Sequence, residues 1–375
     1  MHSARVGMIG AGQLARMTQR AAIDLAVRLE VLAATEDDPA AAIGTPHLIG
    51  PPDDRVLIRE LAAGNDAVTL DHELVPNDVL SELIDEGHRV VPDPAALIYA
   101  QDKLIASSRL WEAGVPIPRF RAVDDAANVE AFASETGWPV VLKAIRMGYD
   151  GRGVVVVDNA RDAATVLAEG GPWMAEEMVD LAMELAVLVA RRPSGDAITY
   201  PLVETIQVDG ICHELVMPAR VDDETSERAI DLALDLVGAI DAAGIVAVEM
   251  FLTTDGRILV NEFAMRPHNS GHATIEGCVT SQFHNHLRAV LDWPLGDTSM
   301  RAPAAAMVNI LGEGDGDLAM RSLPAALEVA GASIHLYGKA ERAGRKIGHV
   351  TALGDDADQA LDIARRAADR LKGTP

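Results

Sequence analysis

Residues 245–262 read IVAVEMFLTTDGRILVNE. Two apolar runs in this stretch flank the turn residues Thr253-Thr-Asp-Gly256, which predicts an antiparallel hairpin. The hairpin would bring Glu249 close to Asn261 and Glu262. Two carboxylates held together repel each other unless a cation lies between them, and Mg²⁺ favours a few carboxylates combined with substrate phosphates. The stretch therefore predicts a magnesium and phosphate site on a sheet, with solvated strand-end acids as the alternative.

A dense polar run, Arg266-Pro-His-Asn-Ser-Gly-His272, follows the hairpin directly. Arginine offers a planar fork for phosphate, while histidine and asparagine can orient an amine or a carboxylate near a metal ion. A hydrogen-bonded turn without a ligand is the alternative interpretation. We expect this run to line the site that the hairpin begins.

A glycine-rich stretch, Arg146-Met-Gly-Tyr-Asp-Gly-Arg-Gly153, follows an apolar strand that ends in Lys143. Glycines let successive backbone N–H groups point at phosphate oxygens, and such a loop can close over a nucleotide. An ammonium group at the end of a buried strand needs an anionic partner, which a phosphate would supply. A plain hairpin turn and a lysine reaching to solvent are the alternatives. No GxxxxGK[ST] sequence occurs, which excludes a P-loop.

The turn Gly10-Ala-Gly12-Gln-Leu-Ala15 fits the dinucleotide-binding pattern, in which a backbone approaches a phosphate at a helix N-terminus. Glu36 follows about twenty residues later, where that pattern places a ribose-binding acid. Taken alone, this favours a nicotinamide-dependent oxidoreductase. The same turn also occurs in many open sheets that bind no dinucleotide, so both interpretations stay open.

The length of 375 residues predicts two or three domains that share a cleft. Short apolar runs alternate with helical patterns up to about residue 100, which predicts an open parallel sheet flanked by helices. A helix is expected over about 100–113, before the proline turn Gly114-Val-Pro-Ile-Pro118. The tail is expected to hold two strands and a closing helix near residues 357–371. The predicted domains are 1–100, 101–300 (with subdomains of about 114–175 and 176–300) and 301–375.

A formal net charge of −25 makes nucleic acids and anionic membranes unexpected partners. The basic cluster His335-Leu-Tyr-Gly-Lys339, Arg342 and Gly344-Arg-Lys346 stands out from this acidic chain and suits a monophosphate ester, with solvent-facing charges as the alternative. No apolar stretch approaches the length of a membrane-spanning helix, and no signal segment begins at Met1. Two distant cysteines lack the spacing of a metal site or a disulfide framework. We therefore expect a cytoplasmic protein.

Taken together and in this order, these motifs resemble the ATP-grasp superfamily, and within it the N5-carboxyaminoimidazole ribonucleotide synthetases of purine biosynthesis. The resemblance covers nearly the whole chain, and the run His268-Asn-Ser-Gly-His272 is its most specific part. Its further motifs are Gln101-Asp102, Tyr200-Pro201, Ser281-Gln-Phe283 and Gly344-Arg-Lys-Ile-Gly-His349.

The resemblance implies a fold of class α/β and α+β. It consists of an N-terminal open parallel-sheet (Rossmann-like) domain, a central ATP-grasp fold of two subdomains that clamp ATP, and a small C-terminal α/β domain. It also implies the reaction and a homodimer. ATP phosphorylates bicarbonate to carboxyphosphate, and the exocyclic amine of 5-aminoimidazole ribonucleotide captures the carboxyl group or the CO₂ released from it. The products are N5-carboxyaminoimidazole ribonucleotide, ADP and phosphate.

The resemblance assigns four groups of site residues. ATP would be bound by Lys103, Lys143, Gly148, Tyr149, Gly151, Arg152, Gly153, Glu176, Glu177, Met178, Val179, Glu184, Gln207 and Asn261. Magnesium, with Mn²⁺ as an alternative, would be held by Glu249 and Glu262. Bicarbonate, carboxyphosphate and the substrate amine would be handled by Asp150, Arg266, His268 and Asn269. The ribonucleotide would be bound by Gln13, Glu73, Lys339, Arg345 and Lys346.

The chain departs from the family pattern at several positions. Lys103 stands where many members have arginine, which keeps the charge but loses the bidentate fork. Ser107 replaces a common lysine, and Asp71-His-Glu73 replaces a glutamate pair. Met265 and Ala273 stand where proline and tryptophan are frequent, and we expect the lost aromatic ring to loosen the substrate pocket.

Two further functions fit part of the pattern. A sister ligase, such as a formate-dependent glycinamide ribonucleotide transformylase, would keep the ATP site, but the run 268–272 and the basic cluster of the tail argue against it. A non-catalytic nucleotide sensor would bind ATP without turnover, since Lys143, Glu249 and Glu262 suit either role. Release of ADP would distinguish a ligase from such a sensor.

Overall fold

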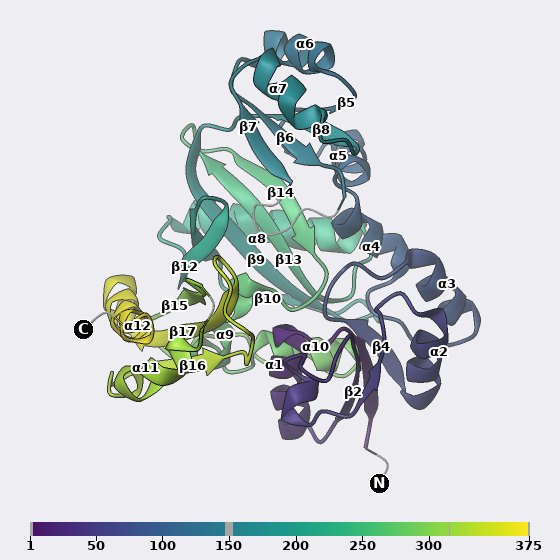
Figure 1. Ribbon diagram of the computed structural model, residues 1–375, viewed down its shortest axis with the longest axis vertical. Helices are drawn as coiled ribbons and strands as arrows, with labels where there is room; N and C mark the ends of the chain where they lie inside the picture. The colour runs from purple at the N-terminus through teal and green to yellow at the C-terminus, as the bar shows by residue number, and fades with distance from the viewer. Residues whose placement is uncertain (1–2, 147–152, 315, 374–375) are drawn as a thin grey trace.

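The N-terminal part of the chain forms an open parallel sheet, drawn in purple in Figure 1. The computed structural model describes residues 3–146, 153–314 and 316–373. The strand order is β3-β2-β1-β4, and the strands are apolar because helices cover them. In chain order the elements are β1 (Arg5–Ile9), α1 (Gln13–Asp24), β2 (Arg28–Ala33), η1 (Ala41–Ile43), β3 (His47–Ile49), α2 (Arg55–Gly64), β4 (Ala67–Leu70) and α3 (Asn77–Asp85). The predicted open sheet is confirmed.

Two helices lead out of this sheet where the sequence predicted one. Helix α4 (Pro94–Gln101) ends before Asp102, and α5 (Lys103–Glu112) begins after it. The Asp102 carboxylate accepts a hydrogen bond from the Ile105 N–H at 2.9 Å, which is the contact of a helix N-cap. The predicted helix over about 100–113 is confirmed as α5, which begins at Lys103 because Asp102 caps it, and the preceding helix α4 was missed.

A small antiparallel sheet with the order β5-β8-β6-β7 lies at the top of Figure 1. Helices α6 and α7 cover one of its faces, and a single apolar cluster fills the space between them. The elements are β5 (Phe120–Val123), α6 (Ala126–Thr136), β6 (Val140–Ala144), β7 (Val154–Val157), α7 (Ala160–Leu167) and β8 (Trp173–Glu177). Lys143 lies near the end of β6, as predicted.

The central sheet is antiparallel and begins β14-β13-β9-β11-β12, with β10 paired to β9. The elements are β9 (Leu181–Arg191), β10 (Ala197–Thr199), β11 (Val203–Val208), β12 (Ile211–Met217), α8 (Asp223–Ala239), β13 (Gly244–Thr253) and β14 (Ile258–Ala264). The predicted hairpin of β13 and β14 is confirmed, and the N–H of Gly256 closes its turn on the carbonyl of Thr253 at 2.9 Å. After it come η2 (Asn269–Gly271), α9 (Thr274–Gly277) and α10 (Gln282–Val290).

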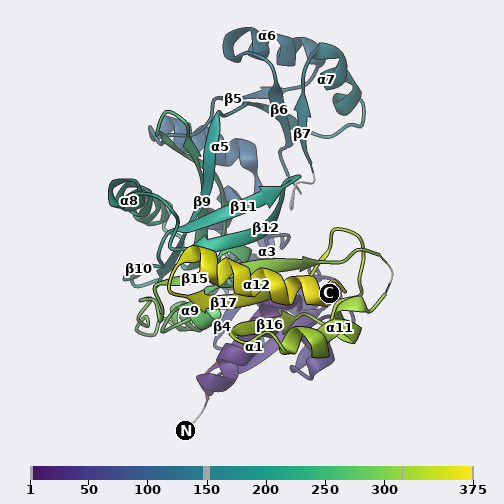
Figure 2. The same cartoon turned by 90° about the vertical axis from the view of Figure 1, so that its left-hand side faces the viewer.

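The tail extends the same central sheet instead of building a separate one. Strand β15 (Ala304–Leu311) pairs with β12, and β17 (Lys346–Gly354) and β16 (Ala332–Leu336) follow. Helix α12 (Ala357–Leu371) packs across β15 and β17, and α11 (Leu318–Leu327) packs against α12 (Figure 2). The sequence predicted the closing helix but missed one of these strands and α11. The central sheet continues across residue 300, where the sequence placed a domain limit. The predicted domain limits therefore remain predictions.

His286 joins the N-terminal and central sheets. This fully buried side chain on α10 contacts the Thr69 hydroxyl on β4 at 3.0 Å and accepts a hydrogen bond from the Ile245 N–H on β13 at 3.4 Å. This buried joint links the sheet that precedes α1 to the strand that begins the β13–β14 hairpin. Within the described ranges, no helix is both long and apolar enough to cross a bilayer.

Candidate active site

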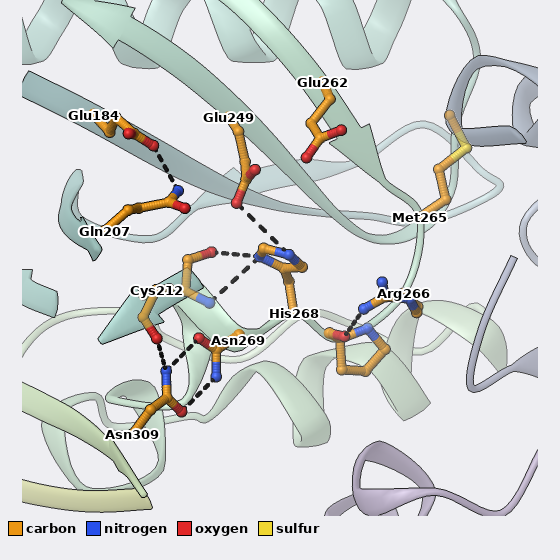
Figure 3. A network of polar contacts seen from close by, with 12 residues as sticks. Glu184, Gln207, Cys212, Glu249, Glu262, Met265, Arg266, His268, Asn269 and Asn309 are labelled. Carbon is orange, nitrogen blue, oxygen red and sulfur yellow. Dashed lines mark hydrogen bonds and ion pairs between the residues drawn. The ribbon is translucent and has the colours of Figure 1, made fainter. Parts of the chain in front are cut away.

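Glu249 and Glu262 lie directly opposite each other on β13 and β14, and both point toward His268 (Figure 3). Burial and the neighbouring Glu262 carboxylate raise the pKa of Glu249 to about 8. Burial also acts against ionisation of Glu262, but Lys103 and Lys143 outweigh it and lower the pKa of Glu262 to about 2. One carboxylate is thus neutralised by lysines, while the other is short of positive charge.

Two lysines face this pair from the neighbouring elements. The ammonium group of Lys103, at the start of α5, contacts Glu262 Oε2. Lys143 Nζ lies 2.6 Å from Glu176 Oε1 and donates a hydrogen bond to Asn261 Oδ1 at 2.9 Å. Burial acts to lower the pKa of Lys103, but the charge of Glu262 outweighs it and the pKa is raised. The structure therefore gathers the lysines, the amide and the acids that the sequence placed in one site.

Glu184 and Gln207 extend the cluster along the central sheet. Gln207 Nε2 on β11 donates to Glu184 Oε2 on β9 at 2.5 Å, and burial raises the pKa of Glu184 (Figure 3). The segment 176–179 covers the end of β8 and the two residues after it: Glu176 is buried against Lys143, Glu177 pairs with Arg119 at 2.6 Å, and Met178 is half exposed. Val179 is partly buried.

The polar run after the hairpin is fixed from three sides. His268 Nε2 lies 3.7 Å from Glu249 Oε1. The carboxamides of Asn269 and Asn309 exchange two hydrogen bonds of 3.0 and 2.8 Å (Figure 3). Arg266 Nε donates to Glu73 Oε2 at 2.8 Å, which brings a residue of the N-terminal part to this run. The run predicted to line the site does face the carboxylate pair.

The basic cluster of the tail meets the start of α1. Lys339 Nζ donates to Gln13 Oε1, which joins positions far apart in the sequence. Arg345 donates to the carbonyl of Ala340 at 3.2 Å, and Lys346 is the first residue of β17. The positive charge of Lys346 also acts on the Glu249 carboxyl, where it lowers the pKa against the larger effect of burial. The structure therefore brings Gln13 and Lys339 together and places Lys346 within electrostatic reach of Glu249.

The turn before α1 already holds an anion of the chain itself. The buried Asp71 carboxylate accepts hydrogen bonds from the N–H groups of Gly12 and Ala15, the latter at 3.1 Å. A Cβ atom on Gly12 would lie 2.5 Å from Asp71 Oδ2. Glu36 contacts His47 at 2.9 Å. Since Asp71 occupies the donors that a pyrophosphate would need, the geometry counts against the nicotinamide interpretation.

Five of the predicted ligands, Gly148, Tyr149, Asp150, Gly151 and Arg152, lie outside the described residues. Gly153 follows them with a φ of 72°, a left-handed value that favours glycine. Its carbonyl accepts a hydrogen bond from the Ala144 N–H at 2.7 Å. The described ranges contain no group of three His, Cys, Asp or Glu side chains arranged to hold a metal ion. Two carboxylates alone suit an ion that takes its remaining oxygens from phosphates.

Three family models match the chain. The Ribonucleotide synthetase preATP-grasp domain matches residues 3–101, the ATP-grasp domain matches residues 108–283, and the Phosphoribosylaminoimidazole carboxylase C-terminal domain matches residues 305–363. The chain is 48% identical to an N5-carboxyaminoimidazole ribonucleotide synthase of Mycobacterium tuberculosis, over 97% of this chain and 86% of the relative. The protein of that name from Corynebacterium ammoniagenes is 44% identical, over 98% and 91%.

The chain belongs to the N5-carboxyaminoimidazole ribonucleotide synthase family. The Aspergillus clavatus synthase crystallised with ADP and 5-aminoimidazole ribonucleotide has a TM-score of 0.92 and 35% identity, over 99% of both chains. The Thermotoga maritima synthetase has a TM-score of 0.85 and 37% identity, over 98% of both. The chain is thus an ATP-grasp ligase that carboxylates with ATP in purine biosynthesis, and the predicted fold class is confirmed.

The departures from the family pattern are accommodated locally. Lys103 keeps a contact with Glu262, and Ser107 lines a small cavity beside it. Met265 is fully buried and its N–H donates to Glu73 Oε1 at 3.2 Å. Ala273 is also fully buried, in the same apolar cluster as Leu188. The Ala273 side chain, which is smaller than the tryptophan frequent at this position, is therefore covered by the residues of this cluster.

Sequence reasoning missed Asn309 and Gln282, two buried side chains that contact the polar run. Asn309 lies on β15, bonds to Asn269 and also donates to the carbonyl of Cys212 at 2.9 Å (Figure 3). Its signal is a lone amide in the apolar stretch AAAMVNIL, because a buried amide has to be hydrogen-bonded. Gln282 lies in the motif Ser281-Gln-Phe283, but nothing in its spacing shows what it contacts.

Proposed function

We propose that this chain carboxylates 5-aminoimidazole ribonucleotide with bicarbonate through carboxyphosphate, releasing N5-carboxyaminoimidazole ribonucleotide, ADP and phosphate. One observation carries the proposal. His268 lies 3.7 Å from Glu249 at the point where the paired carboxylates of the hairpin meet the polar run. A phosphoryl-transfer site and a site for a nitrogen nucleophile therefore share a border, as formation of a carbon–nitrogen bond through an acyl phosphate requires.

ATP and magnesium occupy the cluster on the hairpin in this proposal. Lys103 and Lys143 face the phosphates together with Asn261, while Glu249 and Glu262 hold Mg²⁺ or Mn²⁺. The raised pKa of Glu249 supports this role, because two crowded carboxylates gain from a cation between them. The metal would neutralise charge that develops on the transferred phosphoryl group. Glu184 and Gln207 bind the ribose, residues 176–179 contact the adenine, and the stretch 148–153 covers the phosphates.

Bicarbonate and the ribonucleotide occupy the other side of the cluster. Arg266 offers its guanidinium to carboxyphosphate, while its contact with Glu73 fixes the direction of the side chain. His268 and Asn269, together with Asp150, position bicarbonate and the substrate amine. Gln13, Lys339, Arg345 and Lys346 bind the ribonucleotide phosphate, supported by the contact between Lys339 and Gln13.

Release of ADP by the purified chain tests the proposal. With magnesium, ATP and bicarbonate, we expect addition of 5-aminoimidazole ribonucleotide to stimulate ADP release. Glu262→Gln should lower the stimulated rate about 10²- to 10³-fold, since it removes charge from the phosphoryl-transfer site. The matched control is Glu204→Gln, a buried sheet glutamate that pairs with Arg220 away from this cluster. It should lower stability and leave the rate unchanged.

Three results would overturn parts of the proposal. ATP binding without stimulation by the ribonucleotide would favour a sister ligase or a nucleotide sensor. An unchanged rate in Glu262→Gln would remove this residue from the metal site. An effect of Glu204→Gln as large as that of Glu262→Gln would show that the loss reflects general damage to the sheet.

The remaining expectations complete the proposal. The chain works in the cytoplasm as a homodimer and has no nucleic-acid or membrane partner. Its domains are 1–100, 101–300 and 301–375. Sedimentation tests the oligomeric state, and limited proteolysis tests the domain limits.

A further inference from the structure

Helix α10 carries two buried side-chain amides that hold backbone groups of other segments. Gln282 is fully buried, and its Oε1 accepts the His268 N–H at 2.8 Å while its Nε2 donates to the His268 carbonyl at 2.8 Å. Asn285, one turn later, holds both backbone groups of Gly296 in the same way, at 2.8 and 3.1 Å. One amide therefore grips the active-site run, and the other grips a loop outside it.

The run 268–272 is wrapped around the Gln282 carboxamide. Its Nε2 also donates to His272 Nδ1 at 3.1 Å, so the same amide contacts both ends of the run. Between them, a Cβ atom on Gly271 would collide with Gln282 Oε1, which shows how closely the backbone approaches the amide. The Gln282 N–H donates to Thr274 Oγ1 at 3.0 Å, which fixes the start of α10. The carboxamide thus has its hydrogen bonds satisfied in one orientation.

The ring of His272 connects this run to the C-terminal strands β16 and β17. Its ring lies 4.8 Å from the ring of His349, which lies 4.4 Å from the ring of His335. His349 Nδ1 also contacts the Tyr337 hydroxyl at 2.7 Å. Lys339 follows Tyr337 by two residues and Lys346 precedes His349 by three. The groups expected to hold the ribonucleotide phosphate are therefore packed against the same run.

We propose that Gln282 is a positioning residue for the ribonucleotide side of the active site, a role that rests on the function proposed above. Its buried amide fixes the backbone of His268 and the ring of His272 relative to the carboxylate pair and to the β16–β17 strands. On the ATP side, Lys143, Glu184 and Gln207 are held by other partners. Loss of the amide should therefore weaken the use of the ribonucleotide selectively.

Steady-state ADP release with each substrate varied in turn tests this inference. Gln282→Met keeps the approximate size of the side chain and removes every hydrogen bond of the carboxamide, and Gln282→Glu keeps the acceptor but places a second oxygen against the His268 carbonyl. We expect kcat/KM for 5-aminoimidazole ribonucleotide to fall about 10- to 100-fold in both, as when groups that orient active-site residues are lost. The KM for ATP should stay close to that of the wild type.

Asn285→Leu is the matched control, since it removes an equally buried amide from the same helix. It should lower the melting temperature like Gln282→Met while kcat/KM for the ribonucleotide is preserved. Gln282 variants that melt cooperatively and keep the wild-type kcat/KM would overturn the inference. An equal loss for ATP and ribonucleotide, or the same loss in Asn285→Leu, would also overturn it. A wild-type chain that the ribonucleotide does not stimulate would instead overturn the proposed function.

Discussion

The start of α1 and the β13–β14 hairpin both gather groups that suit an anion. At α1 the N–H groups of Gly12 and Ala15 donate to the buried Asp71 carboxylate, and no room remains for a side chain on Gly12. At the hairpin, Lys103 also contacts a carboxylate of the chain, but the Glu262 side chain is 43% exposed. Its neighbour Glu249 is short of positive charge, so the charge balance there would change if a metal and phosphates bind as proposed.

The comparison shows what a motif can and cannot predict. A glycine turn or a strand-end lysine identifies donors for an anion. Whether a carboxylate of the protein already binds those donors depends on a residue elsewhere in the sequence. That residue is Asp71 at the start of α1 and Glu176 beside Lys143 at the hairpin. At the start of α1 the donors are taken by the buried Asp71, whereas at the hairpin the Glu262 side chain beside Lys103 is 43% exposed and leaves part of the cluster accessible.

Removal of the Lys143 ammonium should give the largest effect. We expect Lys143→Met to lower kcat/KM for ATP about 10²- to 10³-fold, because the site loses a preorganised positive charge. ADP release at varied ATP measures this. The control is Arg121→Met. Arg121 lies on β5 of the same small sheet, and the substitution breaks its exposed ion pair with Glu135 on α6. A wild-type kcat/KM in Lys143→Met would mean that this lysine, like the turn at α1, serves only the chain's own carboxylate.

The closed turn at α1 should show its effect in stability. Asp71→Ala leaves two buried N–H groups without an acceptor, and each such loss costs about 1–3 kcal/mol. We expect the free energy of unfolding to fall by about 2–4 kcal/mol in urea titrations. Asp54→Ala removes a more exposed cap from α2 and should cost about 1 kcal/mol. Equal costs in the two variants would contradict the buried, structural role of Asp71.

Much of this arrangement was predictable from local sequence. The hairpin followed from two apolar runs around Thr253–Gly256, and the open N-terminal sheet followed from alternating strands and helices. The closeness of Glu249 to Asn261 and Glu262 was predictable because hairpin partners lie close together, whereas Lys143 was assigned to the same site through the family resemblance. Register fixes such neighbours without knowledge of the rest of the chain.

Contacts between distant segments were not predictable in this way. The use of Asp71 as an acceptor for α1 depends on the parallel pairing of β1 with β4. The Asn269–Asn309 pair depends on β15 joining the central sheet beside β12. The grip of Gln282 on His268 depends on where α10 packs. Each requires the tertiary arrangement, which periodicity does not encode.

The joint between the two compared regions should weaken in acid. Burial lowers the pKa of His286 to about 3, so the folded protein excludes a proton that the unfolded chain binds below about pH 6.5. Stability from this group is present above pH 6.5 and is lost as pH falls, by about 1.4 kcal/mol per unit. Urea titrations between pH 7 and 5 should show a shallower pH slope in His286→Gln. An unchanged slope would mean that the joint is not held by a neutral imidazole.

The smallest effect should come from Glu36, the residue that completes the dinucleotide pattern at α1. Its side chain is 75% exposed and contacts His47, so Glu36→Ala should change the free energy of unfolding by no more than about 1 kcal/mol. ADP release should be unaffected, and fluorescence titration should detect no NADH binding in either protein. NADH binding that depends on Glu36 would mean that a ligand can displace Asp71 from the helix start, and both compared sites would then exchange their partners.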